Sequence, residues 1–259
     1  MIKGLDKFRA HFEQNRDAFV LIAGVACHEW LASQGLPFRV TKDIDLVLII
    51  EALDESFVER LWAFIEAGNY EIREKAGNRE LYRFSKPKDD TYPAMIEIFS
   101  RKPGGIDLAE GQRVVPIAID EGSASLSAIL LDDAYYSLIL NHRTQDADLP
   151  RVKPAALIPL KARAWLDLTK REKEGQKIDA KDIAKHRADV FRIAATLPGE
   201  PGANISDSVR ADLKAFLDAF PPESAEWAAI LESLKTTFGG TKLHPEDLIN
   251  AIRTYFVIK

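Results

Sequence analysis

Apolar side chains recur at two different intervals along the first half of the chain. Intervals of three and four residues predict amphipathic helices, which cover residues 5–16, 25–33 and 53–67. Short apolar runs bounded by turn residues predict strands, which cover residues 19–22, 43–50, 70–73, 80–85, 94–100 and 114–119. Glycine and proline between these runs supply turns. The alternation predicts a sheet with flanking helices.

After about residue 125 the spacing becomes almost entirely helical. One last strand is predicted over 127–131, and Asp132 or Asp133 can cap a helix that runs through Leu140. Further helices are predicted from Pro154 onward, from Asp179 or Lys181 through Ala195, and over 206–220, 224–238 and 245–256. We therefore predict an α+β fold, with an N-terminal mixed β-sheet domain and its flanking helices over 1–125 and a C-terminal helical bundle over 126–259.

Composition narrows the class of protein. A single cysteine, Cys27, excludes an internal disulfide and fits a reducing compartment. No apolar run has the length of a signal peptide core or of a membrane span, so we expect a cytoplasmic protein without a membrane partner. The net charge is −5, yet residues 151–192 hold 12 of the 35 basic and 6 of the 40 acidic residues. This segment could meet a triphosphate or RNA, or it could form a solvated helix face.

Acidic residues stand at the start of the strand predicted over 43–50. Because side chains alternate between the faces of a strand, Asp43 and Asp45 point the same way. Glu97 lies inside the apolar run Met95–Phe99, and an antiparallel pairing of the two strands would bring it beside the aspartates. Carboxylates favour Mg²⁺ or Mn²⁺, and three of them can hold two ions. The alternatives are surface acids at a strand end and, for Glu97, a buried salt bridge.

The surrounding motif resembles that of a known superfamily. Gly24-x-Ala26 precedes a predicted helix and is followed by Arg39-x-Thr41-x-Asp43-x-Asp45. This arrangement resembles the polymerase β-like nucleotidyltransferases, and most closely the AbiEii/AbiGii toxin-type group. The resemblance implies that the N-terminal domain is a nucleotidyltransferase domain. It also implies that the turn at Gly24 binds nucleotide phosphates through backbone amides.

The resemblance implies two sets of site residues. The catalytic and metal-binding set is Asp43, Asp45 and Glu97. The nucleotide-binding set is Gly24, Arg39, Thr41, Lys42, Lys161, Asp182, Lys185 and Asp189. The chain departs from the pattern at Ala23, where the group commonly has glycine, and at Val25, where it often has a hydroxyl. Lys161 is the expected triphosphate ligand, and its alternative is a solvent-facing lysine.

The expected activity is metal-dependent transfer of a nucleoside monophosphate from an NTP to an acceptor hydroxyl. The acceptor could be tRNA or a protein, and the resemblance to toxins leaves open whether the chain has an antitoxin partner. Two other functions stay open. One is a small-molecule nucleotidyltransferase of the antibiotic-modifying type. The other is a nucleotide-binding or partner-binding module that has lost catalysis, which the departures at Ala23 and Val25 favour.

Overall fold

The fold is α+β and contains two compact units. The computed structural model describes residues 2–75, 78–101, 114–117, 126–144 and 149–259. The first unit, here the sheet unit, comprises Met1–Ala26 and Val40–Val152. The second, here the helical unit, comprises Cys27–Arg39 and Lys153–Lys259. The chain thus leaves the sheet unit within a helix and returns to it just before Thr41. The domain bounds 1–125 and 126–259 stay a prediction.

The strands that the structure describes form one seven-stranded mixed sheet. Four of them follow the order β1-β2-β5-β4 and β3 pairs with β4, while β7 pairs with β5 and β6. β2 runs parallel to β5 and antiparallel to β1. The predicted antiparallel pairing of the strands that carry Asp45 and Glu97 is therefore wrong. The strand bounds are β1 Phe19–Leu21, β2 Asp43–Leu48, β3 Glu71–Lys75, β4 Asn78–Ser85, β5 Met95–Ser100, β6 Val114–Ile117 and β7 Leu126–Leu130.

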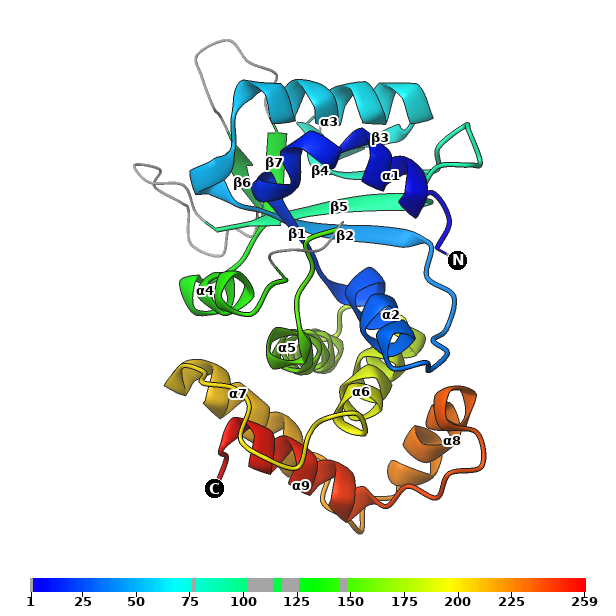
Figure 1. Cartoon of the computed structure of the whole chain (residues 1–259), viewed down its shortest axis with the longest axis vertical. Helices are drawn as coiled ribbons and strands as arrows, with labels where there is room; N and C mark the ends of the chain where they lie inside the picture. The colour runs from blue at the N-terminus through cyan, green and yellow to red at the C-terminus, as the bar shows by residue number, and fades with distance from the viewer. Residues whose placement is uncertain (1, 76–77, 102–113, 118–125, 145–148) are drawn as a thin grey trace. The chain divides into compact units, whose positions relative to one another are not determined.

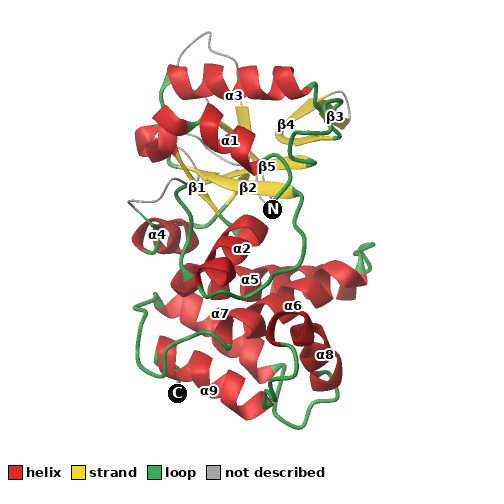
Figure 2. Cartoon of the chain, turned by 45° about the vertical axis from the view of Figure 1, so that its right-hand side comes forward, coloured by secondary structure: helices red, strands yellow, loops and turns green. Residues whose placement is uncertain are grey.

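Helices α1 (Leu5–His11) and α3 (Glu55–Gly68) lie side by side over one face of this sheet (Figures 1 and 2). The predicted helix over 5–16 stops early, because Phe12 leaves helical geometry and a 3₁₀ segment, Glu13–Ala18, follows. A second 3₁₀ turn spans Ile50–Ala52, and α4 spans Asp133–Asn141. Asp54 and Asp132 cap α3 and α4 by accepting a backbone N–H.

The helical unit contains five helices after α2 (Ala23–Ser33) in the described part of the chain. They are α5 Pro154–Lys173, α6 Ala180–Ala194, α7 Asp207–Asp218, α8 Trp227–Phe238 and α9 Pro245–Phe256. Pro154 and Pro245 stand at the first helical position, where no N–H is needed. Aromatic rings pack at its centre; the members are Trp165, Phe191, Phe216, Phe220 and Trp227. No helix among the described residues has the length and apolarity required to cross a membrane.

Candidate functional site

The two aspartates of the D-x-D motif share one face of β2. Asp43 and Asp45 are partly exposed, whereas Ile44 between them is fully buried. From Leu46 to Leu48 the strand is buried on both faces. This burial pattern is typical of a central strand whose first residues reach solvent on one face. The sheet unit therefore presents two carboxylates side by side at the beginning of β2.

Glu97 lies next to Asp45 across the strand pair. Asp45 and Glu97 are register partners on the parallel strands β2 and β5, so their side chains leave the sheet on the same face. The Glu97 side chain is only 13% exposed, and Arg83 on the neighbouring strand β4 forms an ion pair with it. Arg83 Nε donates to Glu97 Oε1 at 2.5 Å. Glu97 is thus both a neighbour of the aspartates and a salt-bridge partner.

The fit of these carboxylates to a metal ion is partial. Within the described residues, no three His, Cys, Asp or Glu side chains converge in a way that could enclose a metal. Mg²⁺, however, is often held by one or two carboxylates together with substrate phosphates and water. Asp43 and Asp45 fit that mode, and Glu97 would have to exchange Arg83 for the ion to join them.

The turn before α2 is tied directly to the D-x-D strand. The Ile22 amide donates to the Asp45 carbonyl at 3.0 Å. Ala23 then adopts φ 51°, a left-handed conformation that favours glycine. The next residue, Gly24, packs closely against Thr41. A Cβ added at Gly24 would lie only 2.5 Å from Thr41 Oγ1. These contacts bring the turn and the D-x-D strand together.

The helical unit contains a buried ion cluster, here the Asp189 cluster, formed by Arg39, Lys161, Asp189 and Arg192. Lys161 Nζ and Arg39 Nη2 each donate to Asp189 Oδ2 at 3.0 Å. Arg192 Nη1 donates to the other oxygen, Oδ1, at 2.5 Å. Lys161 was predicted to be a mobile phosphate ligand, whereas Arg192 was not predicted to be a site residue. The spacing of Asp189 and Arg192 by three residues on one helix could have revealed the pair.

Burial and nearby charges shift the pKa values of Asp189 and of two neighbouring groups away from their ordinary values. Burial would raise the pKa of Asp189, but the three cations Lys161, Arg39 and Arg192 lower it to about 2. Burial and then Lys161 lower the pKa of His186 to about 3, so its imidazole is neutral at pH 7. Burial raises the pKa of the Cys27 thiol to about 11. The cluster therefore carries three positive charges against one negative charge.

Three further predicted nucleotide-binding residues, Asp182, Lys185 and Lys42, are not members of the Asp189 cluster. Asp182 and Lys185 form an exposed ion pair of their own at 3.1 Å on α6. The Lys42 side chain is exposed, and its carbonyl accepts from the Ala94 amide at 2.8 Å. Several basic residues of 151–192 are neutralised by acids; these pairs are Arg163–Asp212, Arg171–Asp167 and Arg187–Glu226. The basic segment is therefore less available to a polyanion than its composition implies.

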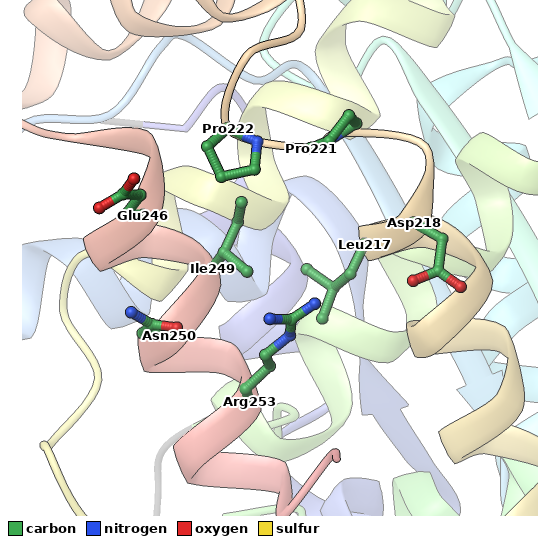
Figure 3. A pocket seen from close by; sticks show the side chains of 8 residues that line it. All are labelled: Leu217, Asp218, Pro221, Pro222, Glu246, Ile249, Asn250 and Arg253. Carbon is green, nitrogen blue, oxygen red and sulfur yellow. The ribbon is translucent and has the colours of Figure 1, made fainter.

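A groove of about 400 Å³ opens elsewhere in the helical unit. Figure 3 shows Leu217 and Ile249 pointing toward each other from α7 and α9, with Pro222 at the rim and Arg253 reaching between the helices. None of the predicted site residues lines this groove. No residue of the Asp189 cluster lines this surface depression.

Comparisons with known proteins add no relative. No protein-family model matches the chain, and searches of curated proteins and of solved structures found no significant match.

Proposed function

We propose that the chain transfers a nucleoside monophosphate from an NTP to an acceptor hydroxyl. The observation that carries the proposal is the placement of Asp43 and Asp45 on one face of β2, with Glu97 in register beside Asp45. Adjacent carboxylates at a strand end repel each other and lose hydration, and a divalent cation relieves that cost. Mg²⁺ or Mn²⁺ is the cation that such oxygen ligands prefer.

The reaction joins the acceptor oxygen to the α-phosphorus of the NTP. The bond from the α-phosphorus to the bridging oxygen breaks, pyrophosphate leaves, and the hydroxyl proton passes to a base. When bound, the metal would acidify the attacking hydroxyl and neutralise charge on the triphosphate. Asp43 and Asp45 would hold the ion. The turn that leads into α2 is bonded to β2 through the Ile22 amide and the Asp45 carbonyl, and the amides at the start of α2 would hold phosphate oxygens.

A second function, nucleotide binding without catalysis, is favoured by one specific contact. Arg83 already neutralises Glu97, so this acid is occupied in the structure as it stands. The left-handed Ala23 is a further departure from a glycine turn. A chain of this kind would retain NTP without turning it over.

The test follows transfer of label from each α-³²P-NTP to total tRNA, to the chain itself and to a small-molecule hydroxyl panel with Mg²⁺ or Mn²⁺. We expect label to appear on one acceptor class, and the variant carrying Asp43→Ala and Asp45→Ala to lose it. A matched control is Glu59→Ala together with Glu66→Ala, which removes two exposed acids from the same unit. An active double aspartate variant would refute the mechanism.

Calorimetry separates the two functions. Metal-dependent NTP binding accompanied by label transfer supports the transferase. Metal-independent NTP binding with no transfer to any acceptor supports the inactive module.

A further inference from the structure

The four side chains of the Asp189 cluster differ in their access to solvent. The side chains of Asp189, Lys161 and Arg192 are 0%, 3% and 5% exposed, whereas that of Arg39 is 32% exposed. A lysine that captures phosphate acts as a flexible, hydrated charge. Lys161 is instead enclosed and bound to Asp189. Within the cluster, Arg39 is the cation that a dissolved anion can reach.

Arg39 is held in the cluster by one hydrogen bond, from its Nη2 to Asp189, and its buried Nε has no hydrogen-bond partner. Three cations surround one carboxylate, so the cluster has an excess charge of +2. An excess of buried positive charge is unfavourable until an anion neutralises it. The planar fork of a guanidinium matches the oxygens of a phosphate.

Arg192 fixes the orientation of the carboxylate that holds Arg39. One of its terminal nitrogens binds Asp189 Oδ1, and the other donates to the Ser233 carbonyl of α8 at 2.9 Å. Asp189 Oδ2 is thereby left to face Lys161 and Arg39. Phe38 completes the support, since the Arg39 guanidinium lies 4.9 Å and that of Arg192 5.7 Å from its ring centroid.

From this geometry we infer that Arg192 and Lys161 are positioning residues, which act through Asp189 to present Arg39 to a phosphate chain. The ligand class is an oligophosphate anion. Anion binding at Arg39 is argued from the Asp189 cluster alone and does not depend on the proposed function. Lys161 is thus assigned to support the site and not to touch the ligand.

The test uses the full chain and inorganic pyrophosphate without metal, with binding measured by calorimetry. Circular dichroism must show that every variant is folded at the temperature used. We expect Arg39→Gln to weaken binding at least about tenfold, and Arg192→Gln to weaken it about tenfold through loss of orientation. The pyrophosphate affinity of Arg192→Lys should fall between those of the wild type and Arg192→Gln, because lysine can keep the ion pair with Asp189 but cannot also reach Ser233.

Arg171→Gln is the matched control. Arg171 lies in the same unit, is also 32% exposed and pairs with Asp167, but it is outside the cluster. Its pyrophosphate affinity should equal that of the wild type. The inference is overturned if the wild type does not bind pyrophosphate, if Arg39→Gln binds normally, or if Arg192→Lys matches the control. Should Arg192→Gln not fold, Arg192→Lys decides.

These outcomes are independent of turnover. A chain that binds pyrophosphate in this pattern but transfers no label leaves the inference standing and removes the proposed reaction. A chain that transfers label while Arg39→Gln keeps its affinity does the reverse.

Discussion

Asp45 and Glu97 are register partners on parallel strands, and they emerge side by side from the same face of the sheet. Arg83 forms an ion pair with Glu97, and the Asp45 carbonyl accepts the Ile22 amide from the turn before α2. The ion pair must open before the Glu97 carboxylate can bind a metal.

The first prediction concerns the metal roles of Asp45 and Glu97. If Asp45 holds the metal, Asp45→Asn should lower label transfer at least about a hundredfold, a loss typical of removing a charge-stabilising group. Arg83→Gln should lower the Mg²⁺ concentration needed for half-maximal transfer, because it releases Glu97 from its competing cation. Mg²⁺ titrations of the initial rate measure both effects. Glu97 has no metal role if Arg83→Gln leaves the Mg²⁺ requirement unchanged.

The second prediction concerns Gly24. Gly24→Ala should destabilise the chain by about 1–3 kcal/mol, because its Cβ would lie 2.5 Å from Thr41 Oγ1. Combined with Thr41→Ala, which removes that oxygen, part of the loss should be recovered. Urea unfolding of the four members of this double-mutant cycle measures the coupling. Gly199→Ala is the control, since a Cβ there meets no atom within 4 Å. Strict additivity would contradict the contact.

The third prediction concerns the left-handed Ala23. Ala23→Gly should stabilise the chain by up to about 1 kcal/mol, because relief of a positive φ outweighs the greater unfolded-state entropy of glycine. The same substitution at Ala26, inside α2, should instead destabilise by about 1 kcal/mol. Denaturant midpoints of the two variants should therefore move in opposite directions. Equal shifts in one direction would exclude a strained Ala23.

The fourth prediction concerns Asp189. Asp189→Asn should lower the free energy of unfolding at pH 7 by about 3–5 kcal/mol, because it leaves buried cations without their counter-charge. The native pKa of about 2 lies below the unfolded value of about 3.9. The carboxylate thus contributes stability above about pH 4 and loses that contribution as the pH falls toward 2.

Urea unfolding at a series of pH values measures this dependence. The difference between the wild type and Asp189→Asn should shrink between pH 4 and pH 2, where protonation makes the two side chains alike. A difference that stays constant across this window would show that Asp189 has an ordinary pKa in the folded chain.

Local patterns in the sequence determined the fold class, the bounds and caps of several helices, and the face on which the two aspartates lie. Strand periodicity is enough to put Asp43 and Asp45 on one face, since neighbouring side chains alternate whatever the strand pairs with. The helix α9 has the predicted bounds, and Asp132 caps α4, because proline and aspartate act within one turn of the backbone. The α+β class follows from the same short-range signals.

Only the tertiary structure decided which distant residues meet. Arg39 and Asp189 are separated by 150 positions, and no local spacing predicts their contact. Three further features depend on how whole elements pack. They are the parallel pairing of β2 with β5, the ion pair between Arg83 and Glu97, and the burial of Lys161. A residue's type states which chemistry it can perform, but burial and the charges around it decide whether that chemistry faces a ligand or supports a neighbour.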